Sequence, residues 1–265
     1  MESENSYVEA LQSDMLLPVG IVHSPRRRLC EEIFPKLPSL SFFFPVHNEQ
    51  NNVERVILQA QAVLPLVAED WEIIPVNDGS TDDTGRIIER IAALDSRIRP
   101  VHHRKNMGYG RAIISGYNAA RLQFVFFTDG DDQFDIAEIT RLIGKLDDAD
   151  LILGFRKNRR ESWIRKTNAF LWGRLVQILF QFRVRDVDCA FKLMKREVVD
   201  AVSLTASGAM VSTELLAKAK NMGFKFAEIG VTHYPRTEGV SSGGNIFVIL
   251  RAFKELFVLY PNLKS

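Results

Sequence analysis

Short apolar runs alternate with amphipathic segments of helical periodicity from Leu40 onward. The apolar runs predict strands, and the longer segments between them predict helices. The predicted strands are 40–46, 71–76, 98–102, 124–128 and 151–155, and the predicted helices are 51–64, 82–94 and 110–121. Strands that alternate with helices imply a parallel sheet with right-handed crossovers, and almost wholly apolar strands imply helices on both faces. We therefore predict an α/β fold around a mostly parallel central sheet.

The pattern becomes less regular after Asp150, although it contains no internal repeat and no low-complexity linker. A basic loop follows the strand 151–155, and we expect an aromatic-rich helix near residues 168–182. We divide the chain into an N-terminal extension over residues 1–37, one continuous domain over 38–242 and a C-terminal amphipathic helix over 243–265.

The C-terminal segment resembles a surface helix more than a membrane span. Arg251, Lys254 and Glu255 lie on one face of such a helix, and Pro261 follows them. Nowhere does an uninterrupted apolar run approach the roughly 20 residues that cross a bilayer. We expect peripheral membrane association at most.

The composition is that of a soluble globular protein, since 46% of the 265 residues are hydrophobic and 25% are charged. A formal net charge of +1 creates no overall field for nucleic acid, so we expect no nucleic-acid partner. Cys30 and Cys189 form neither a disulfide framework nor a zinc-binding spacing. Residues 1–20 lack the pattern of a signal peptide. We expect a cytoplasmic protein that works at the inner face of the membrane if it meets a membrane.

Polar clusters stand at the points where the predicted strands end. They are residues 45–49, 77–80, 105–110 and 129–131. Ligands of parallel α/β sheets bind at the carboxyl ends of the strands. Four polar loops on one edge therefore predict a single binding site.

Asp129 and Asp131 follow the buried strand 124–128, one residue apart. Two carboxylates this close are costly to bury together unless a cation lies between them. Oxygen ligands suit a hard divalent ion, Mg²⁺ or Mn²⁺, which keeps coordination positions open for phosphate oxygens. An acidic turn that caps the next helix is the alternative interpretation.

Two other loops fit a nucleotide. Asp78 ends a strand, where its carboxylate can accept bonds from a base N–H or a ribose hydroxyl, whereas a well-capped helix explains the rest of 77–84. Residues 105–112 lack the dinucleotide fingerprint because Ile113 occupies the position of the third glycine. Their Gly-x-Gly still permits a close backbone approach, and the helix that begins there favours anions.

Four motifs follow one another along the chain: Pro45-Val46-x-Asn48-Glu49, Asp78-Gly79-Ser80-x-Asp82-x-Thr84, Asn106-x-Gly108-x-Gly110-x-Ala112 and Asp129-x-Asp131-x-Gln133. In this order they resemble the family 2 glycosyltransferases. Within that family the chain looks most like the dolichyl- and polyprenyl-phosphate sugar transferases, the group of dolichol-phosphate mannose synthase. The resemblance covers residues 40–242. It implies the GT-A fold, a UDP- or GDP-linked sugar donor and inversion at the anomeric carbon.

The resemblance also implies roles for individual residues on the donor side. Asp131 would act in catalysis, with Mg²⁺ or Mn²⁺ held by Asp129, Asp131 and Gln133. The residues implied in binding the nucleotide sugar are Pro45, Asn48, Glu49, Asp78, Lys105, Asp129 and Gly130.

On the acceptor side, Gly154-Phe155-Arg156 resembles the family's Gly-Ser-Arg, which implies that Arg156 contacts an acceptor phosphate. Arg165 stands where a second catalytic, phosphate-binding arginine is expected. Residues 188–196 resemble the family's Ser-Gly-Phe-Arg-Leu-Met-Arg-Arg element, with Cys189-Ala190 in place of Ser-Gly and Lys192 in place of arginine. Glu214 and the segment 236–241 also fall at matching places.

The chemistry of the acceptor decides which further residues are needed. A phosphate is already anionic and needs only cations to hold it, a task that suits the basic residues of 156–166. We therefore expect a lipid-phosphate acceptor. A hydroxyl acceptor is the alternative and would require a carboxylate base, for which Asp188 and Glu214 are candidates. A nucleotidyltransferase and a binding protein with a dead site are two further alternatives, and the intact acidic pair argues against the second.

Overall fold

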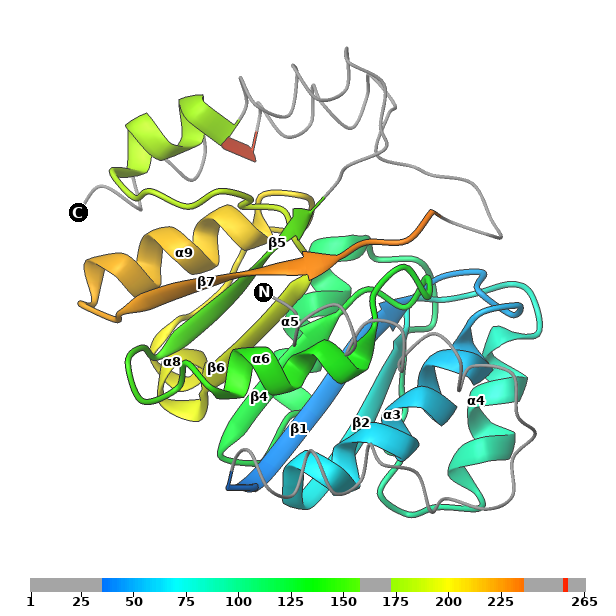
Figure 1. Ribbon diagram of the computed structural model, residues 1–265. Coiled ribbons are helices and arrows are strands. Elements are labelled where there is room, and N and C mark those ends of the chain that lie inside the picture. Colours follow the sequence, from blue (N-terminus) through cyan, green and yellow to red (C-terminus); the bar gives the residue numbers. More distant parts are fainter. Residues whose placement is uncertain (1–34, 158–172, 236–254, 257–265) are drawn as a thin grey trace.

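The computed structural model describes residues 35–157, 173–235 and 255–256. Within these ranges seven strands form one mixed sheet in the order β3-β2-β1-β4-β6-β5-β7 (Figure 1). The strands are β1 Leu37–Val46, β2 Ala68–Asn77, β3 Val101–His102, β4 Phe124–Thr128, β5 Leu151–Lys157, β6 Phe191–Lys195 and β7 Phe226–Thr232. The helices described are α3 Val53–Val67, α4 Thr84–Ala92, α5 Tyr109–Ala119, the 3-10 turn η2 Ile136–Glu138, α6 Ile139–Ile143, α8 Arg196–Ala201, α9 Val211–Asn221 and residues 173–180.

Phenylalanine side chains hold the two central strands in register. β1 pairs in parallel with β4, so that Phe42 lies beside Phe126 and Phe43 lies beside Phe127. Both pairs are stacked, with ring centroids 5.2 Å and 5.1 Å apart, and all four rings are buried. Because successive side chains of a strand point to opposite faces, the two pairs pack on opposite sides of the sheet.

Helices cover both faces of the sheet, with α3 and α6 in front of it and α5 behind it in the view of Figure 1. On the rear face α5 approaches β1 closely. A Cβ added to Gly116 would lie 2.1 Å from Cδ2 of Phe43. Tyr117 packs edge-on against the same ring, with 4.7 Å between the centroids. Glycine at position 116 therefore lets α5 lie directly on the central strand.

The predicted α/β architecture with a mostly parallel sheet is confirmed. The predicted strand 124–128 coincides with β4, and the other predicted elements differ from the observed ones by a few residues at their ends. The helix predicted over 51–64 continues through Pro65 to Val67. Proline is tolerated there because it removes only one hydrogen bond from the last turn.

The sequence pattern predicted neither β6 nor β7. β6 runs antiparallel to both of its neighbours, β4 and β5, and β7 pairs in parallel with β5. Most side chains of β7 are only half-buried, which weakens the apolar signal of a strand.

The predicted division into three parts is not tested by the fold. Almost all of the extension 1–37 and of the C-terminal helix 243–265 lies outside the described residues. Of the helices that the structure describes, none is both long and apolar enough to cross a membrane.

Replacing Gly116 with alanine is expected to lower the free energy of unfolding by about 1–3 kcal/mol, because the added methyl group has no room beside Phe43. At an ordinary helix position the same change would raise that free energy by about 0.5–1 kcal/mol. Urea denaturation followed by circular dichroism measures the difference. Gly173→Ala is the control, since the nearest atom to its added Cβ is Nε2 of Gln177 at 3.8 Å. Equal stability in the two variants would contradict the close packing.

Candidate active site

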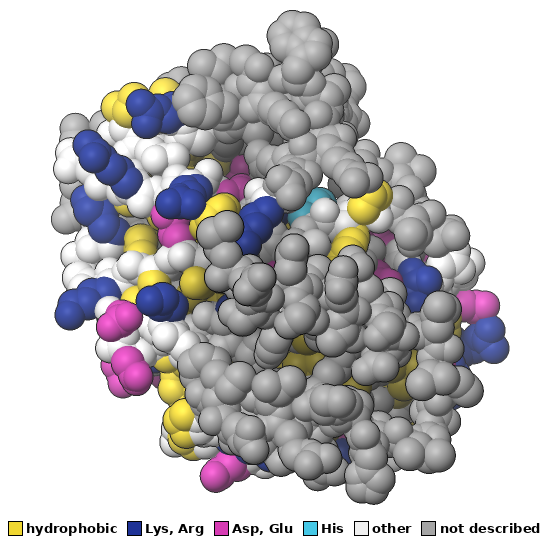
Figure 2. Space-filling model, viewed as in Figure 1, with side chains coloured by type: hydrophobic (Ala, Val, Ile, Leu, Met, Phe, Trp, Pro, Cys, Tyr) yellow, Lys and Arg dark blue, Asp and Glu magenta, His cyan; other side chains and the backbone are white. Residues whose placement is uncertain are grey.

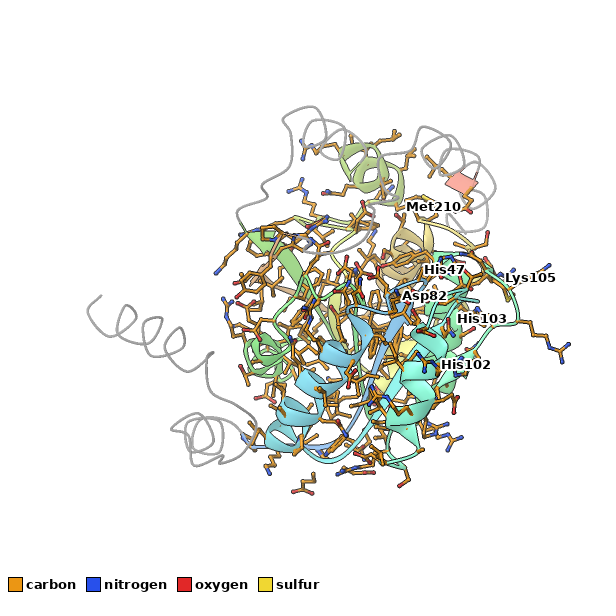
Figure 3. All side chains as sticks on the ribbon, turned by 90° about the vertical axis from the view of Figure 1, so that its right-hand side faces the viewer. His47, Asp82, His102, His103, Lys105 and Met210 are labelled. Atoms are coloured by element: carbon orange, nitrogen blue, oxygen red, sulfur yellow. The ribbon has the colours of Figure 1, made fainter. Side chains whose placement is uncertain are left out.

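The loops after β1, β2, β3 and β4 meet at one edge of the sheet. Val46 at the end of β1 pairs with Asn77 at the end of β2, which pairs with His102 of β3. The N–H of Asp78 donates to the carbonyl of Val46, and the N–H of His103 donates to that of Asn77, each at 2.9 Å. Figure 3 shows His47, Asp82, His103 and Lys105 from three of these loops on one side of the molecule. We call the edge formed by residues 45–49, 78–84, 103–110 and 129–134 the rim.

Asn48 and Glu49 join the loop after β1 to the loop after β2. The backbone of Asn48 is left-handed, with a φ of 56°, which asparagine tolerates better than most residues. Its N–H donates to Oγ of Ser80 at 3.0 Å, and its Oδ1 accepts from the N–H of Thr81 at 2.8 Å. The N–H of Glu49 donates to Oγ1 of Thr84 at 2.9 Å. Both residues therefore shape the rim, and their contacts with a nucleotide stay a prediction.

Asp78 is buried, and its carboxylate organises the loop after β3. Oδ1 accepts a hydrogen bond from the N–H of Met107, and Oδ2 accepts one from the N–H of Gly108, each at 2.8 Å. Nδ1 of His103 lies 2.7 Å from Oδ1, and Nε2 of the same ring lies 2.9 Å from Oγ of Ser115. A base or ribose that binds Asp78 would share a carboxylate that already holds this loop.

Asp129 and Asp131 form an acidic pair at the end of β4. Burial raises the pKa of Asp129 to about 7, and the neighbouring charge of Asp131 adds to the rise. The hydroxyl of Tyr109 donates to Oδ1 of Asp129 at 2.9 Å and opposes the rise, as do the charges of Arg156 and Lys192. Such crowding favours a cation between the carboxylates. Two carboxylates also match the way in which proteins hold Mg²⁺ or Mn²⁺ beside a substrate's phosphates.

The loop of the acidic pair is held on two sides. A Cβ added to Gly130 would lie 2.4 Å from Cγ1 of Val46 and 2.7 Å from the carbonyl oxygen of Pro45. On the other side, Nε2 of Gln133 donates to the carbonyl of Tyr234 at 2.8 Å, and the N–H of Tyr234 donates to the carbonyl of Gln133 at 2.8 Å. Gln133 therefore anchors the loop to the chain beyond β7. A metal contact from its side chain stays a prediction.

Two basic side chains lie near enough to the acidic pair to influence the charge of Asp129. Arg156 on β5 forms a bidentate ion pair with Asp186, through Nε at 2.8 Å and an Nη group at 2.9 Å. An acceptor phosphate would share this guanidinium with Asp186. Lys192 on β6 is fully buried, and its ammonium donates to the carbonyls of Cys189 and Val187. Burial lowers the pKa of Lys192, and nearby acidic groups oppose that shift.

The two carboxylates considered as bases for a hydroxyl acceptor differ sharply. Asp188 is exposed in the loop before β6. Glu214 on α9 is fully buried, and its oxygens accept bonds from Lys218, from the hydroxyl and N–H of Thr205 and from the N–H of Ala206. Burial disfavours its charge, but Lys218 and these N–H donors outweigh burial and lower its pKa. Glu214 therefore anchors the segment before α9, and the role of Asp188 as a base stays a prediction.

Some predicted site residues cannot be placed in this geometry. Arg165 and most of the basic loop lie outside the described residues, as does the segment 236–241. Lys105 is exposed on the rim, and its contact with a donor stays a prediction. Sequence reasoning also missed Tyr109 and Asp186. A buried arginine needs a carboxylate partner, which could have pointed to Asp186. Nothing in the pattern marked Tyr109.

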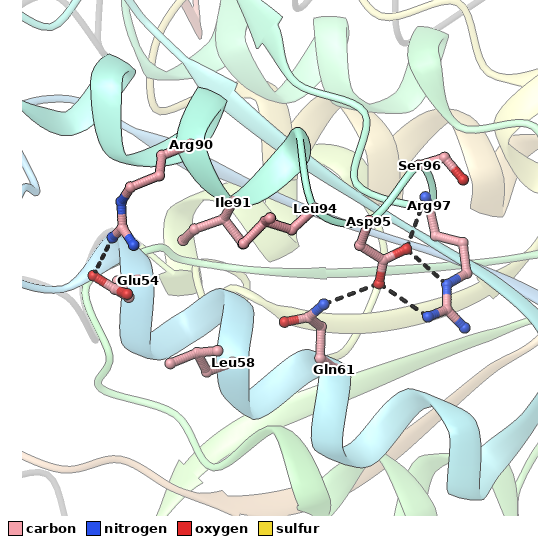
Figure 4. Close-up of a pocket in the computed structure, with 9 residues that line it drawn as sticks. All are labelled: Glu54, Leu58, Gln61, Arg90, Ile91, Leu94, Asp95, Ser96 and Arg97. Carbon is pink, nitrogen blue, oxygen red and sulfur yellow. Dashed lines mark hydrogen bonds and ion pairs between the residues drawn. The ribbon is translucent and has the colours of Figure 1, made fainter.

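A groove of about 570 Å³ lies apart from the rim, between α3 and α4 (Figure 4). Leu94 is exposed beside it, and the ion pairs Glu54–Arg90 and Asp95–Arg97 flank it. None of the predicted site residues that the structure describes lines this groove, so the rim remains the candidate site.

The model of the family named Glycosyl transferase family 2 matches residues 41–203. The chain is 28% identical over 210 residues to undecaprenyl-phosphate 4-deoxy-4-formamido-L-arabinose transferase of Klebsiella pneumoniae, covering 78% of this chain and 63% of that protein. It is 30% identical over 204 residues to the protein of the same name from Enterobacter, covering 76% and 62%. The chain thus spans less than two thirds of the length of these relatives.

Among solved structures, the glucosyl-3-phosphoglycerate synthase of Mycobacterium tuberculosis is similar in fold. Its complex with Mn²⁺, uridine diphosphate and phosphoglyceric acid matches with a TM-score of 0.60 and 22% identity, over 78% of this chain and 74% of that one. This likeness confirms the predicted GT-A fold. The extent of the family match shows more: the chain belongs to glycosyl transferase family 2.

Glu214→Gln is expected to lower the free energy of unfolding by about 1–3 kcal/mol at neutral pH, because an amide cannot accept from all four donors. Folding lowers the pKa of Glu214, so its contribution is present above the ordinary value of 4.5 and is lost as the pH falls through the folded pKa. Urea denaturation at pH 7 and at pH 3 should therefore show a smaller difference between wild type and variant at pH 3. A fully stable variant without transferase activity would instead make Glu214 a base.

Proposed function

We propose that this chain is an inverting, metal-dependent glycosyltransferase that moves a sugar from a UDP- or GDP-linked donor to a polyprenyl phosphate. The observation that carries the proposal is the acidic pair of Asp129 and Asp131 on the same rim as the loops after β1, β2 and β3. A nucleotide diphosphate needs a cation at its phosphates and a polar surface at its nucleoside. The two carboxylates support the first requirement, and the polar loops of the rim support the second.

The acidic pair fits Mg²⁺ or Mn²⁺, which would be held by Asp129 and Asp131, with Gln133 beside them. When bound, the ion neutralises charge on the leaving diphosphate. The chain's own residues position the donor. Asp78 fixes the loop 103–108, and the small Gly130 lets the acidic loop lie against the end of β1. Pro45, Asn48, Glu49 and Lys105 complete the donor surface that we propose.

The acceptor side supports a phosphate nucleophile. A phosphate carries its own negative charge and needs no base, so cations are enough to hold it. Arg156 lies close enough to the acidic pair to influence the pKa of Asp129, and we propose that Arg165 holds the acceptor phosphate together with Arg156.

Arg174, Arg183 and Arg185 are exposed, and basic side chains gather at the upper left of Figure 2, where Figure 1 has the helix over 173–180. This surface suits an anionic membrane that presents a lipid phosphate.

The names of similar proteins support the two halves of the proposal separately. The relatives from Klebsiella pneumoniae and Enterobacter are named as transferases of undecaprenyl phosphate, which supports a polyprenyl-phosphate acceptor. The structural relative from Mycobacterium tuberculosis binds Mn²⁺ together with uridine diphosphate, which supports a divalent ion beside a nucleotide donor.

A hydroxyl acceptor is a second candidate. The same structural relative was solved with phosphoglyceric acid, a small molecule that is not a lipid. Such an acceptor would need a base. Asp188 is the candidate, because it is an exposed carboxylate in the loop before β6, close in sequence to the buried Lys192.

A donor panel tests the proposed function directly. Purified protein is incubated with UDP- or GDP-sugars, Mg²⁺ or Mn²⁺ and a short polyprenyl phosphate, and the lipid extract is read by mass spectrometry. A glycosylated lipid phosphate is the expected product. Metal-dependent release of nucleoside diphosphate without a lipid product would favour the hydroxyl acceptor. No turnover with any donor would overturn both candidates.

Asp131→Asn is expected to lower the rate of transfer by about 100-fold or more, because the change removes charge that holds the ion. Asp132→Asn is the matched control. Asp132 is adjacent, but its carboxylate is held by Arg55 and Gln59 of α3. Transfer rates and melting temperatures of both variants are the measurements. Similar rates in the two variants, with both folded, would remove Asp131 from the proposed metal site.

A further inference from the structure

Tyr109 connects the loop after β3 to the acidic pair. It is the first residue of α5, and its hydroxyl donates to Oδ1 of Asp129 at 2.9 Å. The residue is 40% exposed, so the contact lies at the surface of the rim and not in the core. The motif Asn106-x-Gly108-x-Gly110 leaves position 109 open, and the family resemblance therefore assigns this tyrosine no role.

The backbone on both sides of Tyr109 is fixed. Before it, the N–H groups of Met107 and Gly108 donate to the carboxylate of Asp78. After it, a Cβ added to Gly110 would lie 2.6 Å from the carbonyl oxygen of Ala206, so the backbone packs closely there. Tyr109 therefore projects from a rigid support. The loop 103–108, which Asp78 holds in place, therefore sets the position from which the hydroxyl reaches Asp129.

We propose that Tyr109 is a positioning residue that orients Asp129 toward the divalent ion of the nucleoside diphosphate. The inference rests on the proposed function, because it takes Asp129 as a ligand of that ion. The terminal torsion of an aspartate is soft, so an isolated carboxylate samples many orientations. A hydrogen bond to Oδ1 restricts that torsion and presents the remaining acceptor positions of Asp129 in one orientation.

A tyrosine hydroxyl suits this task better than a basic side chain. It donates one hydrogen bond and carries no charge, so it orients the carboxylate without cancelling the negative charge that binds the ion. Partners of this kind, which contact a ligand of the metal but not the metal, commonly change metal affinity by about 10–100-fold.

The test is the affinity for Mn²⁺, measured by electron paramagnetic resonance in the presence of saturating UDP, with GDP in a parallel series. Tyr109→Phe removes only the hydroxyl and is expected to weaken Mn²⁺ binding by about 10-fold. Tyr117→Phe is the matched control on the same helix. The hydroxyl of Tyr117 is buried and has no hydrogen-bond partner among the described residues, so its loss should leave Mn²⁺ affinity unchanged.

Asp129→Asn separates failure of this inference from failure of the proposed function. If Asp129→Asn weakens Mn²⁺ binding but Tyr109→Phe does not, Tyr109 has no positioning role and the metal site stands. If Asp129→Asn leaves Mn²⁺ affinity unchanged, or the wild type binds no Mn²⁺ with either nucleotide, the proposed metal site fails and the inference fails with it.

A double-mutant cycle tests whether Tyr109 acts through Asp129. In the Asp129→Asn background, Tyr109→Phe should cause little further loss of Mn²⁺ affinity, because the carboxylate that it orients is already gone. Losses that multiply independently would show that Tyr109 acts by another route and would overturn the proposed mechanism.

Discussion

The stacking of phenylalanines between β1 and β4 sets the geometry on which the rim depends. Phe42 meets Phe126 on one face of the sheet, and Phe43 meets Phe127 on the other. A shift of one residue would send each ring to the wrong face, so the register is strongly specified. The same register delivers Gly130 against the end of β1, where a Cβ does not fit. An apolar interaction in the core thus places the acidic pair.

Among the residues that the structure describes, negative charge gathers at the acidic pair of the rim. Asp129 and Asp131 crowd each other, and the two described basic groups that influence Asp129, Arg156 and Lys192, are already engaged. Arg156 is paired with Asp186, and the ammonium of Lys192 is bound to backbone carbonyls. Interactions between such groups are stronger in a partly buried site than in water. A cation bound at the rim would therefore complete the local charge balance, while the paired residues hold the shape.

Much of this arrangement was predictable from the sequence, and the exceptions have physical reasons. Apolar runs identified the strands β1 to β5, and polar residues after the first four of them located the rim. β6 was missed because it has only five residues and Lys192 and Lys195 interrupt its apolar pattern. Asp78 contacts residues that lie 25 or more positions away in the sequence, and Tyr109 contacts a residue 20 positions away. Periodicity carries no information about such distant partners. The sequence could not identify Glu214 as a structural residue, because its four hydrogen-bond donors are evident only in the folded structure.

The bond between Gln133 and Tyr234 joins positions 101 residues apart in sequence. Because ordering long-range contacts requires closing a long loop, such contacts form after local ones. A ribosome must release the chain beyond Tyr234 before the loop of the acidic pair gains this anchor. The hydrogen bonds that join residues 48 and 80–81, and those that join Asp78 to the loop 103–108, involve no residue beyond 120, so they can form while the acidic loop still lacks its last support. Assembly of the site would then end with the docking of the segment after β7.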